Sequence, residues 1–219
     1  ILKLSPNQSR TDILAIERKN GTVLIFAARF ENWDLVHYLL SGLSPGEQML
    51  LANQSGEDTL TTLQIAILAG NVEMVEFLLP MTTEALAADL MMTATEERSG
   101  KVFKYLFERR EEIGLALDSN FADTLAWAAV EKDNLVALKC MLEVFPESVL
   151  NFGAPAFLLG LRLQDIEFAQ SLYKAADALH LNRRLREMVT QQDDRGNTAF
   201  DYALDYAFAH QPGDSIALE

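Results

Sequence analysis

The feature of this sequence that most restricts its fold is an internal repeat. A stretch near residues 21–40 recurs near residues 61–79 and again near residues 123–142. Each copy has a threonine, then a leucine and an alanine three residues apart, then an asparagine followed by an apolar run. A chain built from copies of one short motif folds as a row of similar units. The leucine–alanine pairs are Leu24 and Ala27, Leu63 and Ala66, and Leu125 and Ala128.

Each copy is typical of two short helices joined by a turn. The threonine supplies an N-cap hydroxyl, and the small alanines allow the second helix and the next copy to approach closely. A break at Gly70, or at Glu31 and Asn32, reverses the chain, and apolar residues then follow at helical spacing. One helix pair cannot bury its apolar face alone, so the copies are expected to stack.

Weaker copies extend the array to five or six irregular repeats, which we predict to form a single domain over residues 1–219. The predicted repeats lie near residues 17–42, 57–80, 84–110, 118–145, 151–176 and 193–210. A capping helix is predicted at residues 5–16, and inserted helices at residues 45–52 and 176–190. Ser44, Pro45 and Glu47 give the first inserted helix a capping-box pattern with proline at the first helical position.

This pattern resembles the ankyrin repeat, whose consensus contains T-P-L-H-x-A in a unit of about 33 residues. The best local matches are Asp193-x-x-Gly196-x-Thr198-x-Phe200 and Gly70-x-x-x-Met74-Val75-x-x-Leu78-Leu79. The resemblance implies an all-α solenoid of stacked antiparallel helix pairs. The proline is absent throughout, and the histidine is replaced by Ile25, Gln64, Ala126 and Asp201. Because the family uses these two residues to tie the turn to the helix start, we expect a less regular array.

The charge balance restricts the partners of this chain. It has 18 Lys and Arg against 32 Asp and Glu, a net charge of −14, which repels phosphate backbones and anionic lipid surfaces. We therefore expect neither nucleic acid nor a membrane as the main partner. The single cysteine, Cys140, excludes an internal disulfide framework and suits a reducing compartment such as the cytoplasm. The chain lacks an initiating methionine, so we expect it to be a piece of a longer protein.

The sequence contains none of the common phosphate-loop, dinucleotide, serine-hydrolase or zinc-protease motifs. His37 is expected on a solvated helix face, and Asp177 with His180 offers too few ligands for a metal. Cys140 occupies a position that the repeat reserves for an apolar residue. We therefore predict no enzymatic activity, no cofactor and no metal. The basic cluster Arg183-Arg184-x-Arg186 is either a solvated helix face or a docking point for an acidic or phosphorylated segment.

The resemblance places partner binding on a concave surface made of turn tips and of the variable pair that follows the alanines. The corresponding tips are Arg18, Lys19, Asp58, Asn120, Phe121 and Arg195. The corresponding pairs are Arg29 and Phe30, Leu68 and Ala69, Val130 and Glu131, and Arg162 and Leu163. Each pair has one large apolar residue, and the series consists of Phe30, Leu68, Val130 and Leu163. This apolar series is either covered by insertions and terminal segments or forms a groove for a partner helix or peptide.

These observations favour a non-enzymatic adaptor that binds another protein, acts inside the cell and is monomeric. One alternative is the recognition arm of a larger multidomain enzyme whose catalytic part lies outside this chain. A second is a pocket that depends on Cys140 or His180. The divergent repeats also resemble those of effector proteins that intracellular bacteria deliver into host cells, which would place the chain in the host cytoplasm.

Overall fold

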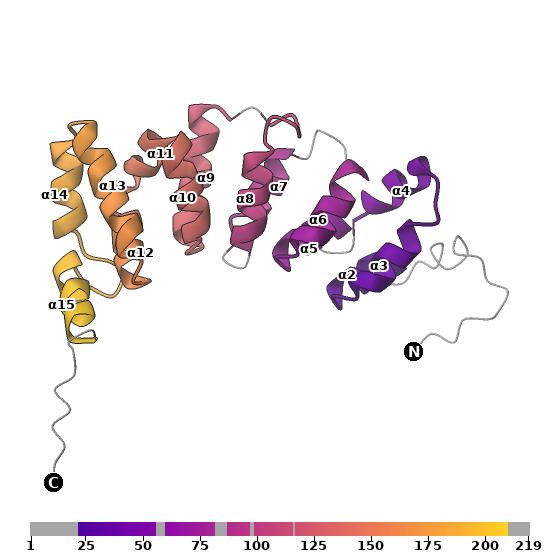
Figure 1. The fold of residues 1–219 in the computed structure, drawn as a ribbon, viewed down its shortest axis with the longest axis horizontal. Coiled ribbons are helices and arrows are strands. Elements are labelled where there is room, and N and C mark those ends of the chain that lie inside the picture. The colour runs from indigo at the N-terminus through magenta and orange to yellow at the C-terminus, as the bar shows by residue number, and fades with distance from the viewer. Residues whose placement is uncertain (1–21, 56–59, 82–86, 97–98, 116, 210–219) are drawn as a thin grey trace, which may run out of the picture. The chain divides into compact units, whose positions relative to one another are not determined.

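The structure is a computed structural model that describes residues 22–55, 60–81, 87–96, 99–115 and 117–209. Within these residues it is helical, with no strand beyond one isolated antiparallel bridge between Ser55 and Thr61. The chain divides into two compact units, residues 1–116 and 117–219, called the N-terminal and C-terminal units below (Figure 1). The single domain stays a prediction, and the capping helix at residues 5–16 lies outside the described residues.

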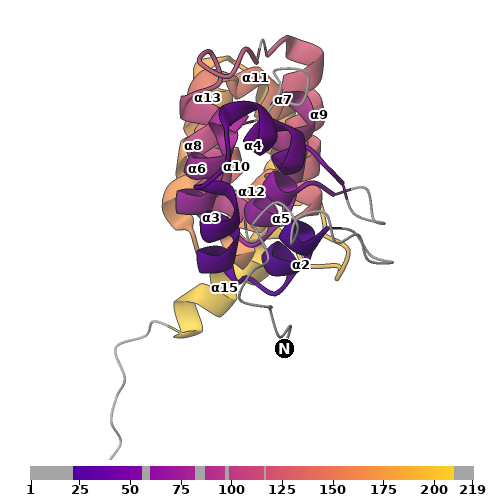
Figure 2. The ribbon, with the colours of Figure 1, turned by 90° about the vertical axis from the view of Figure 1, so that its right-hand side faces the viewer.

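The described part of the N-terminal unit contains three helical hairpins. Their first helices pack side by side, α2 on α5 and α5 on α7, while α6 packs on α8 in a second row. Figure 2 separates the two rows, with α3, α6 and α8 on one side and α2, α5 and α7 on the other. The hairpins are α2 (Val23–Arg29) with α3 (Trp33–Leu40), α5 (Thr62–Leu68) with α6 (Val72–Leu78), and α7 (Ala87–Thr93) with α8 (Gly100–Glu108).

An extra helix, α4 (Pro45–Ala52), joins the first hairpin to the second and covers the residues expected for an insertion. It begins with the capping box of Ser44 and Glu47. Side-chain amides tie the insertion to its neighbours: Gln48 Nε2 donates to the Leu40 carbonyl at 3.0 Å, and Asn53 Nδ2 donates to the Met81 carbonyl at 2.8 Å. The second contact reaches the short 3-10 helix η1 (Leu79–Met81) that follows α6.

The C-terminal unit is built around α12, which packs against α11, α13, α14 and α15. One helix here was not predicted, the short α11, which begins at Pro146 with proline in its first turn. The residues expected to form one inserted helix at 176–190 are divided between α13 and α14, because the chain turns at His180. The helices are α9 (Ser119–Glu131), α10 (Leu135–Val144), α11 (Pro146–Asn151), α12 (Gly153–Arg162), α13 (Ile166–Ala178), α14 (Asn182–Thr190) and α15 (Ala199–Ala209).

Four of the hairpins turn in the same way. The residue after the C-cap of the first helix has the left-handed conformation, and the amide of the next residue donates to a carbonyl five positions earlier, as in a Schellman motif. The left-handed residues are Glu31 (φ 52°), Gly70 (φ 69°), Asp133 (φ 54°) and Gln164 (φ 58°). The returning bonds of 2.8–3.0 Å run from Asn32 to Ala27, Asn71 to Ala66, Asn134 to Ala129 and Asp165 to Gly160. The residue after the left-handed one also caps the second helix with its side chain.

This turn fixes the register of the repeats and corrects the alignment of the fourth. The carbonyl that receives the returning bond belongs to Ala27, Ala66 and Ala129, so Ala129 rather than Ala128 is the equivalent alanine. Ala129 is fully buried, whereas Ala128 is half-buried. The leucine motif misled the alignment because the fourth repeat has one more residue between Leu125 and the capping asparagine than the first two have between their leucines and theirs.

Threonine caps the first helix in the first two repeats, as the sequence predicts. Thr22 Oγ1 accepts from the Ile25 amide, and Thr61 Oγ1 accepts from the Gln64 amide at 3.2 Å. In the second repeat Gln64 completes a capping box by accepting from the Thr61 amide at 2.9 Å. The fourth repeat differs, because the N-cap of α9 is Asp118. Thr124 therefore lies inside the helix.

We expect Asn71→Ala to lower the free energy of unfolding of the N-terminal unit by about 1 kcal/mol. The Asn71 side chain accepts from the Met74 amide at 3.0 Å, and alanine would leave that amide without its capping partner. Urea denaturation followed by far-UV circular dichroism measures the change. Asn71→Asp is the matched control, because aspartate also accepts at an N-cap, and it should retain most of the stability. An equal loss in both variants would contradict the capping role.

Candidate protein-binding surface

The residues that precede the left-handed turn residue occupy the same structural position in these four hairpins. We call the last residue of the first helix and its C-cap the pre-turn pair. The pre-turn pairs are Arg29 and Phe30, Leu68 and Ala69, Glu131 and Lys132, and Arg162 and Leu163. Three match the sequence prediction, and the fourth repeat is shifted by one residue, so that Val130 is replaced by Lys132. Phe30 is 79% exposed and Leu163 is 47% exposed, while Leu68 is half-buried.

The predicted turn tips are only partly placed. Arg18, Lys19 and Asp58 lie outside the described residues. Asn120 and Phe121 are not at a tip, since Asp118 starts α9 before them and its Oδ1 accepts from the Phe121 amide at 2.8 Å. Assigning these two residues to a tip was therefore wrong.

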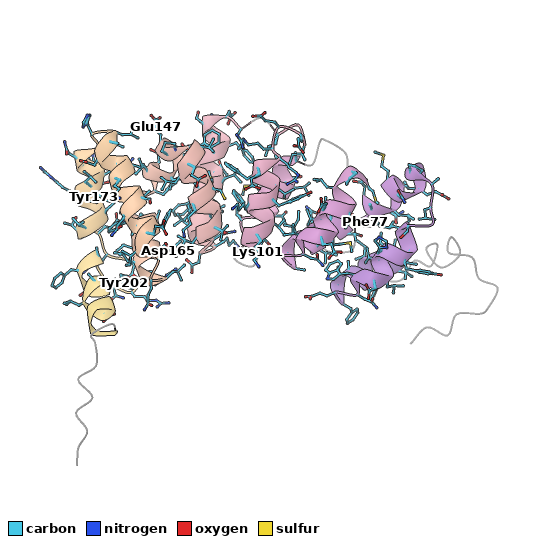
Figure 3. All side chains as sticks on the ribbon, in the orientation of Figure 1. Phe77, Lys101, Glu147, Asp165, Tyr173 and Tyr202 are labelled. Carbon is cyan, nitrogen blue, oxygen red and sulfur yellow. The ribbon has the colours of Figure 1, made fainter. Side chains whose placement is uncertain are left out.

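Arg195 does lie in a turn, which Asp193 organises. The Asp193 Oδ1 atom accepts from the backbone amides of Arg195 and Asn197, both at 2.9 Å. Asp193 Oδ2 accepts from the Tyr202 hydroxyl in α15 (Tyr202 is labelled in Figure 3). The hydrogen bond from Tyr202 holds the pKa of Asp193 below its ordinary value, and the two amides and the Arg162 guanidinium act in the same direction. Asp193 is therefore an ionised carboxylate that serves the turn.

Three predicted residues come together at one cavity in the C-terminal unit. It has a volume of about 380 Å³ and lies between the end of α9, one side of α12 and the segment that connects α14 to α15. Val130, Glu131 and Arg162 line it, together with an apolar floor of Pro155, Leu158 and Leu159. Sequence analysis missed the remaining polar lining, Asp133, Gln191, Gln192, Asp193 and Asp194, since these residues follow helices that lie apart in the sequence.

An ion pair closes one side of this cavity. Arg162 Nη2 donates to Asp133 Oδ1, which connects the last residue of α12 to the turn before α10. A second ion pair, between Lys139 of α10 and Asp165 at the start of α13, links the same two repeats (Asp165 is labelled in Figure 3). Burial raises the pKa of Asp165, but hydrogen bonds from Lys139 and the Phe168 amide outweigh it and lower the pKa overall.

Beside the cavity lies an aromatic pair. The rings of Trp127 and Phe152 have centroids 5.3 Å apart, and Trp127 is 44% exposed. The repeat pattern also accepts an apolar residue about one turn before each variable pair, which predicts that Trp127, Phe26, Ile65 and Leu159 are mostly core. Ile65 and Leu159 are buried, but Phe26 is half-buried and Trp127 contributes to the surface.

The residues considered for catalysis do not assemble into a site in the described part of the chain. His37 is exposed and lies against Phe77 of α6, with ring centroids 4.5 Å apart. Asp177 and His180 do not share a helix face, because α13 ends at Ala178 and His180 has φ 55°. Cys140 is half-buried. No group of three or more potential metal ligands occurs among the described residues.

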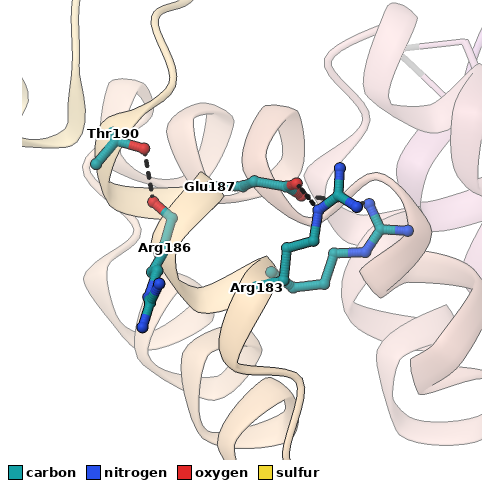
Figure 4. A network of polar contacts seen from close by, with 5 residues as sticks. Arg183, Arg186, Glu187 and Thr190 are labelled. Atoms are coloured by element: carbon teal, nitrogen blue, oxygen red, sulfur yellow. Dashed lines mark hydrogen bonds and ion pairs between the residues drawn. The ribbon is translucent and has the colours of Figure 1, made fainter.

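The basic cluster on α14 is partly neutralised by its own helix. Arg183 Nε lies 2.8 Å from Glu187 Oε1, and Arg184 Nη1 lies 3.5 Å from Glu187 Oε2 (Figure 4). The Thr190 hydroxyl donates to the carbonyl of Arg186, one helical turn earlier. Pairing within the helix favours the interpretation of this cluster as a solvated face.

Comparison with known families identifies the repeats. Residues 24–115 match the family described as ankyrin repeats in three copies, and this stretch contains the three hairpins of the N-terminal unit. Residues 24–115 are therefore ankyrin repeats, and the described part of the chain is an all-α, solenoid-like series of helix pairs. Comparison with curated proteins gave no match, and comparison with solved structures gave none either.

Ankyrin repeats have a general function. Ankyrin repeats mediate protein–protein interactions, and the family is typically non-catalytic. No helix among the described residues is long and apolar enough to cross a membrane.

Proposed function

We propose that this chain is a non-enzymatic binding module whose pre-turn pairs contact a partner protein. The observation that carries the proposal is the exposure of large apolar side chains at this one structural position. Phe30, at 79% exposed, and Leu163, at 47% exposed, are both C-cap residues directly before a left-handed turn residue. Contiguous exposed apolar patches mark interaction sites, and within the N-terminal unit the helix of Phe30 packs against the helix of Leu68.

The arrangement within the N-terminal unit supports this role. Because α2 and α5 pack against each other, the pre-turn pairs of the first two repeats belong to neighbouring helices. The Phe26 and Phe30 rings stack with centroids 6.5 Å apart, which extends the apolar surface along α2. This position corresponds to the concave surface of ankyrin arrays, and we propose a helix or an extended peptide of the partner as its ligand.

The side chains of Phe30 and Leu163 make none of the hydrogen bonds that hold their turns, so they can serve in recognition. The turn is held by backbone bonds and by the capping side chain that follows it. We place the activity inside a cell, because a chain with one cysteine has no internal disulfide to lose in a reducing compartment. A monomeric state and an effector role in a host cell stay predictions.

We expect Phe30→Asp combined with Leu68→Asp to abolish capture of the partner while leaving melting nearly unchanged. The substitution places two charges on the apolar surface of the N-terminal unit, which an apolar partner residue would then have to desolvate. Wild-type and variant chains serve as baits in a eukaryotic lysate, and the proteins recovered are quantified by mass spectrometry. Each protein lost with the variant is then purified and titrated against both baits.

The control is Met49→Asp combined with Leu50→Asp on α4, two exposed apolar residues of the same unit that lie outside the pre-turn pairs. It makes the same change in charge and should retain the partner. The melting temperature of the Phe30/Leu68 variant should fall by no more than about 2–4 °C, the shift that 1 kcal/mol produces in a chain of this size. A larger fall would mean that the surface is buried, and equal capture by both variants would contradict the proposal.

A further inference from the structure

The cavity of the C-terminal unit has an unbalanced charge. Four carboxylates line it, from Glu131, Asp133, Asp193 and Asp194, against the single guanidinium of Arg162. Asp133 is paired with Arg162, and Asp193 accepts the hydrogen bonds that hold its turn. No hydrogen bond or ion pair engages the side chains of Glu131 and Asp194 within the described residues. The cavity lining therefore carries more negative than positive charge, and the carboxylates of Glu131 and Asp194 can face a ligand.

The floor of the cavity is apolar, which distinguishes it from a solvated acidic patch. The floor consists of Pro155, Leu158 and Leu159 of α12, and Val130 of α9 adds to the apolar lining. Both leucines are at most 4% exposed. A ligand that suits such a site combines an aliphatic stem with a cationic end. Lysine and arginine side chains have this form, since they lay their methylene groups on apolar surface while the charged end stays near water.

The aromatic pair gives the same ligand a second contact. Trp127 lies one helical turn before Val130 and Glu131 on α9, and Phe152 lies one turn before Pro155 at the start of α12. Both helices thus lead from an apolar surface at Trp127 and Phe152 to the acidic cavity. From Phe152 to Arg162 the helix rises about 15 Å, a length that about four or five residues of an extended peptide cover.

We propose that the cavity binds a lysine or arginine side chain of the partner protein, and that an apolar residue of the same segment contacts Trp127 and Phe152. This inference rests on the proposed function and names the chemistry of the partner segment. The two anchor residues are separated by about three to five positions in an extended segment. The net charge of −14 further favours encounter with a basic partner.

Selection from a displayed library of random dodecapeptides on the full chain tests this assignment. We expect the enriched peptides to share a lysine or arginine and an apolar residue at the stated separation. A selected peptide is then synthesised together with its version in which glutamine replaces the cationic residue. Affinities are measured by isothermal titration calorimetry at low and high salt. Loss of the cation should weaken binding about tenfold or more at low salt, and less at high salt.

Glu131→Gln combined with Asp194→Asn should weaken the cationic peptide by about tenfold, with little effect on the neutral version. The matched control is Glu143→Gln combined with Asp177→Asn, two exposed carboxylates of the same unit that do not line the cavity and whose loss changes the net charge equally. This control should bind like the wild type, and circular dichroism should be the same for all three chains.

Several outcomes would overturn the inference. One is enrichment of peptides without a cationic residue, and another is equal binding by the two double variants. A dimer that dissociates on Glu131→Gln with Asp194→Asn would assign the cavity to a second copy of the chain. In another outcome, peptides bind well but lose affinity only when Phe30 and Leu68 are changed. That result would support the proposed function and contradict this inference. The absence of any enrichment over an unrelated acidic protein would contradict both.

Discussion

Replacing Phe168 by alanine is expected to lower the free energy of unfolding of the C-terminal unit by about 3–5 kcal/mol. Phe168 lies in the first turn of α13, is 2% exposed, and is among the largest side chains that are fully buried. Alanine would leave a cavity at the crossing of α12 and α13, which the two helices can fill only in part. The loss is a large share of the stability of a small domain.

The measurement is urea denaturation in a Trp33→Phe background, in which the fluorescence of Trp127 reports the C-terminal unit alone. Phe200→Ala is the matched control, because Phe200 lies on α15 in the same unit and is 67% exposed. That change should alter the stability by no more than about 0.5 kcal/mol. Equal effects at Phe168 and Phe200 would show that the ring of Phe168 is not part of the core.

The second large effect is expected at Gly160, where the same two helices approach each other closely. A Cβ atom on Gly160 would lie 2.9 Å from Phe168 Cδ1 and 3.5 Å from Ala169 Cβ. Gly160→Val should therefore cost about 1–3 kcal/mol, because the side chain overfills a packed crossing. Alanine is a weaker test, since its helix propensity exceeds that of glycine by about 1 kcal/mol and offsets the crowding.

A double-mutant cycle shows whether the steric contact is the cause. Phe168→Leu removes part of the ring that meets the new side chain, so Gly160→Val should cost less in that background than in the wild type. Gly46→Val on α4 provides the control, because nothing lies within 4 Å of a Cβ atom at that position. Additive effects of Gly160→Val and Phe168→Leu would contradict the contact.

The sequence predicts the hairpins best where a local signal and the repeat agree. Thr22 and Thr61 cap their helices and Gly70 forms its turn as expected, because N-caps and left-handed glycines depend on neighbouring residues. Gln64 was expected only as a departure from the family histidine. In the structure its carbonyl oxygen accepts from the Thr61 amide. Asp201 does the same for the Thr198 amide, so the connection between turn and helix is retained by other side chains.

The candidate site was less predictable, for two physical reasons. Non-glycine residues such as Asp133 and Gln164 adopt the left-handed conformation at the turns, so the position of the turn in the fourth repeat carries no glycine to mark it. The register of that repeat therefore slipped by one residue. The cavity combines the end of α9 with residues 191–194, which lie about sixty positions later in the chain. Helical periodicity describes each helix by itself and contains no information on which connection covers it.

The hairpin turns separate two tasks that many proteins assign to the same residues. Backbone bonds and one capping side chain, such as Asn71, hold the turn, and the side chains of Leu68 and Ala69 just before it make none of these bonds. Changes at such positions alter what the surface recognises at little cost in stability. A protein organised in this way can acquire a new ligand through a few substitutions at helix ends. Each variant along that series of substitutions still folds.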